Sequence, residues 1–351
     1  MSPQPRIAQG VHRVSIRILE IYTSKGTRSV EPKISVIIPV KNEARHIASC
    51  LQAIRGQTLK PFEVIVVDGH SMDGTVAIAK TFGTRVFFEE YRTRAGACQV
   101  GLQETQGDLV AFTDADCLPD PRWLETLARD FADDCAGVGG RIENEGDTFW
   151  QRCVDIALNT LVGSANSVQG KTFAEQRYVS SISGCNSMYR RKDLIEIGGF
   201  NTELVTSEDT ELNRRMLRRG KLLYVPDAIV HHRHQRGLRD FAHRMFQYGY
   251  GRGQTLLMGP PLLMPLLAVG LLVLAVLQPW YAVALLGGYL AILLVSSVGA
   301  AVRKRQLKLL AAVPVIYLIE HVCYAAGFWT GIFRTRLPRR SRVSWPEENT
   351  P

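Results

Sequence analysis

The chain of 351 residues lacks any closely paired cysteines. Its seven cysteines are scattered, their number is odd, and no C-x-x-C pair occurs. This pattern is not that of a disulfide framework and favours a reducing compartment. The N-terminus, "MSPQPRIAQGVHRVSIRILEIY", also lacks an apolar core of signal-peptide length. We therefore expect the first domain to be made and kept in the cytoplasm.

The sequence has no zinc-finger, RNA-binding or basic-zipper pattern, although its formal net charge is +9. The excess positive charge is clustered in residues 1–33, in "RKRQLK" at 303–308 and in "RTRLPRRSR" at 334–342. Because two of these clusters flank apolar segments, they indicate an anionic membrane surface more than a nucleic acid. We expect membrane lipids as partners and no nucleic acid.

Strand and helix patterns alternate over the first part of the chain. Apolar, β-branched runs predict strands at 34–40, 62–68, 85–88 and 108–114, and helical spacing follows each of them. This alternation predicts an α/β fold with a doubly wound, mainly parallel sheet. Beyond residue 141 the pattern loosens, and "KLLYVPDAIVHH" at 221–232 is typical of two strands separated by a proline turn.

The second part of the chain carries long uncharged runs. Residues 260–280 and 281–302 each have the length needed to cross a bilayer core, and the short linker between them predicts a hairpin. The basic residues 303–308 place its open end in the cytoplasm by the positive-inside rule. A third segment, 309–333, contains Pro314 and the pair Glu320 and His321, so we expect a shallow or re-entrant path that returns the tail to the cytoplasm. Buried ionisable groups at membrane depth are often functional, although these two could simply pair with each other.

An amphipathic segment joins the two parts. In "LRDFAHRMFQYGYGRG" the apolar and the charged residues take opposite sides of a helix, which is typical of a helix in the headgroup layer. The alternative is an ordinary core helix. The expected organisation is a basic extension (1–33), an α/β domain (34–235), an interfacial amphipathic helix (236–255), a membrane region (256–333) and a basic tail (334–351).

Acidic residues follow several predicted strands. Glu43 comes just after the first strand, Asp68 ends the second, "TDADC" follows the fourth, and "TSEDTE" opens a later helix. The carboxyl ends of strands form the working edge of such a sheet. Each acid alone could make a turn or cap a helix. Together they predict a site in which two carboxylates one residue apart hold a divalent ion on a diphosphate.

Five motifs in order resemble the inverting family 2 glycosyltransferases, which have a GT-A nucleotide-sugar-binding domain. They are "ISVIIPVKNEARHIASCLQAI", "VIVVDGHSMDGT", "AFTDADC", "GCNSMYRRKDLIEIGGFN" and "SEDTELNRRMLRRG". The resemblance covers about residues 34–235. The helix and hairpin that follow are similar to the membrane-bound branch, which builds exopolysaccharide repeat units or glycosylates lipid carriers on the cytoplasmic face.

The resemblance implies a donor site at the strand ends, made of Pro39, Val40, Glu43, Asp68, Arg94, Asp114 and Ala115. In this site Asp68 would accept a hydrogen bond from the base, most often uracil. Asp114 would face the ribose and the outer shell of the metal. Arg94 matches a basic position near the nucleotide, and its alternative is a surface arginine.

The resemblance also implies the catalytic groups. Asp116, with Asp114, would hold Mn²⁺ or Mg²⁺, and His232 would be an additional ligand. Asp209 would be the general base and Glu208 its less certain partner; the alternative is that both acids favour the N-terminus of a helix. On the acceptor side the resemblance implies Gly184, Cys185 and Asn186. We interpret Cys185 as packing and not as a nucleophile, because no base motif accompanies it.

The chain departs from the processive synthases of this family. These carry a Q-x-x-R-W motif after the base, whereas this chain has "RMFQYGYGRG" in that region and few spans. We therefore expect a membrane-anchored, metal-dependent enzyme at the inner membrane. It would move one sugar from a nucleotide sugar to a hydroxyl of a lipid-linked or other glycan acceptor. We expect the donor to be a UDP-sugar. The alternatives are a polyprenyl-phosphate sugar synthase, whose anionic acceptor needs no base, and a catalytically dead scaffold.

Overall fold

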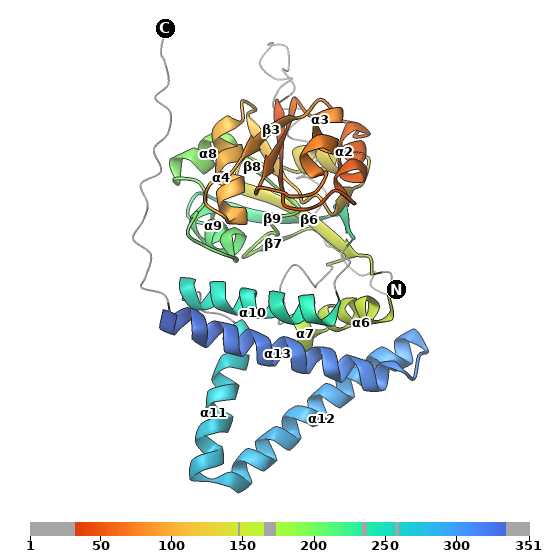
Figure 1. The fold of residues 1–351 in the computed structure, drawn as a ribbon, viewed down its shortest axis with the longest axis vertical. Coiled ribbons are helices and arrows are strands. Elements are labelled where there is room, and N and C mark those ends of the chain that lie inside the picture. The colour runs from red at the N-terminus through yellow and green to blue at the C-terminus, as the bar shows by residue number, and fades with distance from the viewer. Residues whose placement is uncertain (1–31, 147, 165–172, 234–236, 257–259, 335–351) are drawn as a thin grey trace, which may run out of the picture.

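The computed structural model describes residues 32–146, 148–164, 173–233, 237–256 and 260–334. An α/β domain lies above two helices, α10 (Leu238–Thr255) and α13 (Leu309–Arg334), that run side by side (Figure 1). A hairpin of two further helices projects from the other side of this pair. Almost all of the expected basic extension and basic tail lies outside the described residues.

The α/β domain is built on a nine-stranded sheet. The strand order is β3-β2-β1-β4-β8-β6-β9-β5, with β7 paired to β9. The bounds are β1 Ile34–Val40, β2 Glu63–Asp68, β3 Arg85–Phe88, β4 Leu109–Phe112, β5 Cys117–Pro119, β6 Cys135–Asn144, β7 Arg177–Val179, β8 Ser187–Arg190 and β9 Lys221–His232. Strands β1 to β4 are all parallel, as are β6 and β9, whereas β8 is antiparallel to both of its neighbours. The predicted doubly wound, mostly parallel sheet is confirmed.

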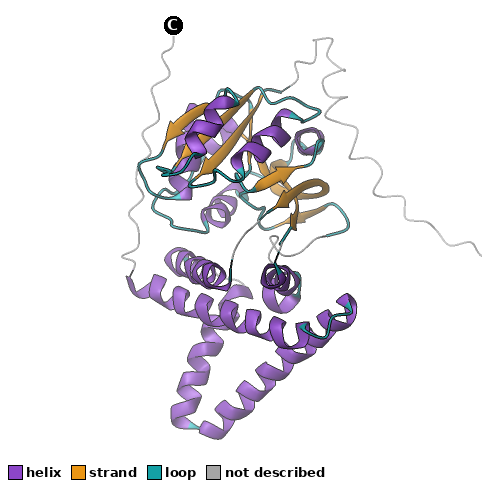
Figure 2. Cartoon of the chain, turned by 45° about the vertical axis from the view of Figure 1, so that its right-hand side comes forward, coloured by secondary structure: helices purple, strands orange, loops and turns teal. Residues whose placement is uncertain are grey.

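Helices cover both faces of this sheet (Figure 2). One face of the sheet packs against α2 (Ile47–Arg55), α3 (Thr75–Thr81) and α5 (Trp123–Arg129). The other face packs against α4 (Arg94–Glu104), α8 (Arg191–Glu196) and α9 (Glu208–Met216). The continuous apolar run of β1 is therefore buried on both sides, as expected for a central parallel strand. The carboxyl ends of β1 and β4 lie side by side at one edge.

Two strands differ from the sequence expectation. Strand β6 was not expected, because its glycines resemble a loop; a side chain at Gly140 would meet the backbone of Ala228 at 1.9 Å, which is why glycine stands there. The prediction of two strands around Pro226 was wrong. Residues 221–232 form one strand, β9, whose register shifts opposite Gly140 and Arg141, so the extra residues bulge without ending the pairing.

Helix α10 lies within the expected range 236–255, but one of its sides is covered by another helix. Its apolar residues Phe241 and Met245 are buried in one cluster with α13 residues such as Val313 and Ile316. Glycines allow close backbone contact, since a side chain at Gly249 would meet the Tyr324 carbonyl at 2.0 Å. The apolar face of α10 is thus covered by α13, as in an ordinary core helix.

The membrane region contains α11 (Leu263–Leu277), α12 (Pro279–Lys304) and α13, with a 3₁₀ turn at Pro260–Leu262 before α11. Helices α12 and α13 are long and apolar enough to cross a membrane, whereas α11 has 15 residues. At 1.5 Å per residue, α11 is about 22 Å long, which is shorter than the roughly 30 Å of a hydrocarbon core. The sequence prediction overestimated the first span, because the segment from 260 to 262 forms the 3₁₀ turn.

The third apolar segment is one continuous helix through Pro314 and has no re-entrant break. Glu320 and His321 do not pair with each other. His321 hydrogen-bonds through Nδ1 to the Tyr289 hydroxyl at 2.8 Å and through Nε2 to the Val162 carbonyl at 3.0 Å. It thereby ties α13 to α12 and to α7 (Leu161–Ser164), which follows α6 (Phe149–Leu158).

Candidate active site

A single cavity of about 2110 Å³ opens at the carboxyl ends of β1 and β4. It brings together most of the residues predicted for the site. These are Pro39, Val40, Glu43, Arg94, Asp114, Ala115, Asp116, Gly184, Cys185, Glu208, Asp209 and His232. Ligands bind at this edge of open α/β sheets, because the strand ends and the following loops converge there.

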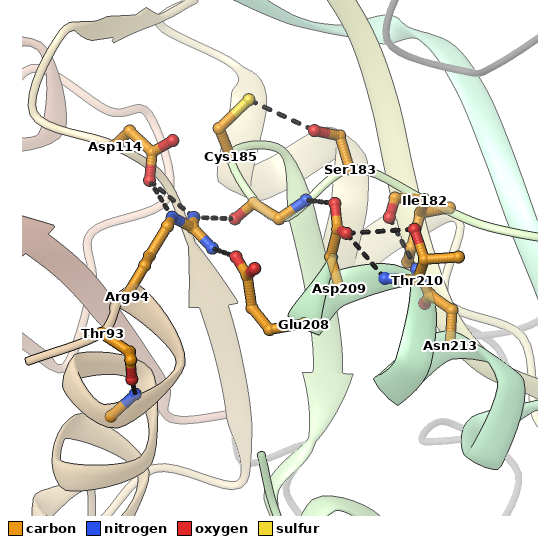
Figure 3. Close-up of polar contacts among 12 residues, drawn as sticks. Thr93, Arg94, Asp114, Ile182, Ser183, Cys185, Glu208, Asp209, Thr210 and Asn213 are labelled. Carbon is orange, nitrogen blue, oxygen red and sulfur yellow. Dashed lines mark hydrogen bonds and ion pairs between the residues drawn. The ribbon is translucent and has the colours of Figure 1, made fainter. Parts of the chain in front are cut away.

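Arg94, at the start of α4, connects the two halves of this site (Figure 3). Its guanidinium donates to Asp114 Oδ1 at 2.6 Å, to Glu208 Oε1 at 2.6 Å and to the Gly184 carbonyl at 3.0 Å. Three partners in different directions match the fixed fork of an arginine side chain. Arg94 therefore positions two acids, and the carboxylate of Asp114 is engaged with Arg94.

The charges in this network depend on one another. Burial raises the pKa of Glu208; the Arg94 guanidinium opposes this rise and the neighbouring Asp209 carboxylate adds to it. Burial of Arg94 disfavours its own charge, but the carboxylates of Asp114 and Glu208 outweigh burial, and its pKa is raised well above the ordinary value. Arg94 is thus held as a cation, and its charge favours the ionised form of Glu208.

Asp209 lies in the first turn of α9, with its carboxylate held by backbone groups (Figure 3). Its Oδ2 accepts from the Gly184 amide at 3.1 Å, and its Oδ1 accepts from the Thr210 amide at 2.6 Å. The preceding Ser207 has φ of +63°, in the left-handed region that non-glycine residues rarely adopt. Such strain persists where the surroundings over-determine the backbone, as they do at functional sites. Gly184 therefore links Arg94, through its carbonyl, to Asp209, through its amide.

Asp116 and His232 meet because β5 pairs antiparallel with β9, in a register that sets Cys117 opposite His232. His232 Nε2 lies 3.3 Å from Asp116 Oδ2. On its other side, His232 Nδ1 lies 3.0 Å from Asn144 Oδ1, and this amide oxygen can only accept. Asn144 thus favours the tautomer that leaves Nε2 open to a metal ion, as second-layer partners of metal-bound histidines do.

Cys117 completes a group of three possible ligands with Asp116 and His232, whose ligand atoms lie within 4.8 Å of one another. Burial raises the pKa of the Cys117 thiol well above its ordinary value, so the thiolate that binds metals is disfavoured. Mn²⁺ and Mg²⁺ also prefer oxygen and imidazole ligands to sulfur. The donors that fit such an ion are therefore Asp116 and His232, whereas Asp114, the other predicted ligand, is bound to Arg94, and Cys117 is a packed neighbour.

The comparisons with known proteins agree with this geometry. The family model described as "Glycosyl transferase family 2" matches residues 35–198. Residues 35–198 are a family 2 glycosyltransferase domain. The glycosyltransferase AglE of Haloferax volcanii is 29% identical over 240 residues, which cover 65% of this chain and 75% of the relative.

A second relative extends over nearly the whole length. The dolichyl N-acetyl-alpha-D-glucosaminyl phosphate 3-beta-D-2,3-diacetamido-2,3-dideoxy-beta-D-glucuronosyltransferase of Methanococcus voltae is 24% identical, over 86% of this chain and 97% of the relative. Among solved structures, the mannosyltransferase PcManGT from Pyrobaculum calidifontis, in complex with GDP-Man and Mn²⁺, has the same fold, with a TM-score of 0.58, 20% identity and coverage of 87% of this chain and 88% of that one. The chain therefore shares its fold with this structure, and the glycosyltransferase family model matches its residues 35–198.

Two predicted site residues lie outside the cavity, although both fall within the matched residues 35–198. Asp68 is completely buried, and its two oxygens accept from the Ser71 amide and hydroxyl, so it shapes the turn after β2. Asn186 is also completely buried; its amide group donates to the carbonyls of Arg141 and Ala228 and accepts from the Trp123 indole. Asn186 therefore joins strands and does not line the cavity.

The glycosyltransferase site also contains a cation that the motifs did not indicate. Burial raises the pKa of Glu43, His46 and Arg244 oppose the rise, and Asp116 adds to it. Arg244 of α10 thus lies close enough to act on a carboxyl of the donor end of the cavity. The sequence signal was the charged side of α10, which was expected to lie in the headgroup layer of a membrane.

Proposed function

We propose that this glycosyltransferase is a membrane-anchored, inverting enzyme of glycan synthesis, in an exopolysaccharide or glycolipid pathway. It moves one sugar from a UDP-sugar to a hydroxyl of a lipid-linked or membrane-proximal acceptor at the cytoplasmic face of the cell membrane. The observation that carries the proposal is the single cavity lined by the Asp116 and His232 pair and by Asp209. The Asp116 and His232 pair suits the diphosphate of a donor, and Asp209 suits the hydroxyl of an acceptor.

The proposed chemistry is one displacement at the anomeric carbon. Asp209 takes the proton from the acceptor hydroxyl while that oxygen attacks, and the nucleoside diphosphate leaves from the opposite side. The amides of Gly184 and Thr210 hold the carboxylate in place for this step. Arg94 beside it opposes the burial that raises the pKa of Glu208. No covalent enzyme intermediate is required, and a single displacement inverts the configuration.

A divalent ion, Mn²⁺ or Mg²⁺, fits the residues present. Asp116 and His232 would hold it, and Asn144 would keep the His232 ring in the required orientation. When bound, such an ion neutralises negative charge on the departing diphosphate. Both residues lie at the donor end of the cavity, on the same side as Glu43.

The relatives and the helices support the acceptor class. The relative from Methanococcus voltae is named for a dolichyl-linked sugar phosphate acceptor. Helices α12 and α13 are long and apolar enough to cross a membrane. The basic residues 303–308 at the end of α12 favour the cytoplasm for this end of the hairpin. The alternative is a polyprenyl phosphate that attacks directly. Because its phosphate is already anionic, this acceptor would not need Asp209 as a general base.

The test uses the full chain purified in detergent with Mn²⁺ or Mg²⁺. We expect UDP release from one member of a panel of UDP-sugars when a lipid extract supplies the acceptor. Asp209→Asn should abolish transfer and retain donor binding, whereas Asp116→Asn should lose metal-dependent donor binding. The control is Asp227→Asn, in the exposed bulge of β9. Normal turnover by Asp209→Asn would overturn the base assignment, and a GDP-sugar as the only donor would overturn the UDP assignment.

A further inference from the structure

The cavity that contains the catalytic acids continues beyond the transferase domain. It passes α10 and is lined by side chains of the hairpin, including Leu267 of α11 and Leu285 and Ile292 of α12. Pockets for one small ligand usually measure about 300–1,000 Å³. The volume of about 2110 Å³ therefore leaves room for a second, larger ligand beside the donor.

Arginines line the middle of this cavity. Arg244 and Arg252 of α10 are eight residues apart, which is about 12 Å along a helix. Arg244 lies near Glu43 at the donor end. Arg252 follows Gly251, whose Cα lies so close to Thr206 that an added Cβ would meet Thr206 Oγ1 at 2.3 Å. Thr206 is three residues before Asp209, so Arg252 lies on the acceptor side.

A third arginine, Arg214 of α9, lines the same cavity. In the described part of the chain neither Arg214 nor Arg252 forms an ion pair, although many other arginines of the domain do. Cations that line a cavity without acidic partners favour an anionic ligand. Arg214 follows Asp209 on α9, and Arg252 follows the glycine that packs on Thr206, so such an anion would lie near the base.

Most of the side chains that the hairpin helices contribute to the cavity are apolar. Helices α11 and α12 meet near Gln278 and diverge toward α13 (Figure 1). Gly288 of α12 lines the cavity, and a side chain built there would meet nothing within 4 Å. The large apolar side chains of these helices are widely exposed, as expected for surfaces in contact with lipid. A ligand with a long apolar chain can therefore enter from the side of the membrane.

We propose that the cavity binds the acceptor as a long-chain lipid phosphate or diphosphate, with the chain between α11 and α12, the phosphate at Arg252 and Arg214, and the reacting sugar at Asp209. The order of acids, arginines and apolar side chains along the cavity matches the order of sugar, phosphate and lipid in such a molecule. The inference rests on the proposed function and names the part of the acceptor that the fold recognises.

The test is lipid binding to the full chain in detergent micelles, followed by native mass spectrometry. The probes are undecaprenyl phosphate, undecaprenol, which lacks the charge, and geranyl phosphate, which lacks the long chain. We expect undecaprenyl phosphate to bind at least about tenfold more tightly than either of the others, which is roughly the effect of one good contact. Equal binding of all three would overturn the proposal.

Two variant pairs locate the site. Gly288→Trp fills the space between α11 and α12 and should weaken undecaprenyl phosphate about tenfold, without affecting geranyl phosphate. Its control, Gly287→Trp, changes the neighbouring residue, which does not line the cavity. Arg252→Gln should remove the preference for undecaprenyl phosphate over undecaprenol, whereas Arg239→Gln, an exposed position of α10 outside the cavity, should keep it. If a variant and its control changed the binding of undecaprenyl phosphate equally, the assignment of the lipid site would be overturned.

Failure of this inference can be told from failure of the proposed function. If the wild type transfers sugar to lipid extract but Gly288→Trp and Arg252→Gln bind undecaprenyl phosphate normally, the lipid site is wrong and the enzyme assignment stands. If undecaprenyl phosphate binds as expected but no nucleotide sugar is consumed, the binding site stands and the transferase proposal fails.

Discussion

The contact between Gly251 and Thr206 leads to a sharp prediction for Gly251→Ala. Gly251 is buried in α10, and the added methyl group would lie 2.3 Å from Thr206 Oγ1 and 2.6 Å from the Thr206 carbonyl oxygen. Thr206 also donates its hydroxyl hydrogen bond to the Gln247 carbonyl of the same helix at 2.7 Å. The substitution should therefore displace the backbone of Thr206, which is followed in the chain by Ser207 and Asp209.

The size of the effect of Gly251→Ala depends on which of the two contacting segments can be displaced. Helix α10 is held from its other side by α13, since side chains at Gly249 or Gly253 would meet α13 backbone atoms at 2.0 and 2.2 Å. The displacement therefore falls on the segment before Asp209. Overpacking of this kind lowers the free energy of unfolding by about 1–3 kcal/mol. The higher helix propensity of Ala offsets about 1 kcal/mol of this loss. A shift of the base by about 1 Å can lower the rate roughly 100-fold.

The assay is steady-state transfer with the donor and acceptor varied separately. We expect Gly251→Ala to lower kcat by about 10- to 100-fold, because the base is misplaced. The KM for the donor should stay unchanged, because Asp116 and His232 are not displaced. Gly299→Ala, in α12, gains the same helix propensity with nothing within 4 Å of the new methyl group and should behave as wild type. The reasoning is refuted if Gly251→Ala turns over like Gly299→Ala.

Three further predictions concern the site. Arg94→Lys keeps one charge but cannot bridge Asp114, Glu208 and the Gly184 carbonyl together, so kcat should fall about 100-fold; full activity at unchanged pH dependence would contradict this role. Asn144→Leu removes the partner of His232 and should weaken Mn²⁺ binding about 10- to 100-fold, measured by calorimetry; unchanged affinity would count against the histidine as a ligand. Burial raises the pKa of Cys98 to about 12, so its neutral thiol should resist iodoacetamide at mildly alkaline pH until the chain is unfolded, and rapid labelling of the native protein would disprove this.

Much of the α/β domain was predictable from the sequence, because its signals are local. The apolar runs of β1, β2 and β4 and the acids that follow them indicate parallel strands with a common edge. The pairing of Asp116 with His232 was expected from the family resemblance. Its structural cause is the register of β5 against β9, which no local pattern reveals.

The residues that sequence reasoning missed depend on long-range contacts. Strand β6 is rich in glycine because Ile182, Tyr189 and Ala228 pack over it, so it resembled a loop and Asn144 at its end went unnoticed. Arg244, on the charged side of α10, was expected in the headgroup layer, and no role was expected for Arg252. Their orientation toward the cavity follows from the burial of the opposite side of α10 against α13, which only the tertiary structure shows.

The packing of α10 against α13 has a consequence for the order in which the enzyme is made. Helix α13 is the last described element to leave the ribosome, and the donor-binding strands are synthesised long before it. Until residues 309–334 have emerged, α10 lacks the partner that presses it toward Thr206 and the base. A chain that terminates before residue 309 should therefore retain the donor motifs and transfer no sugar, so catalysis begins only when translation of the membrane region is complete.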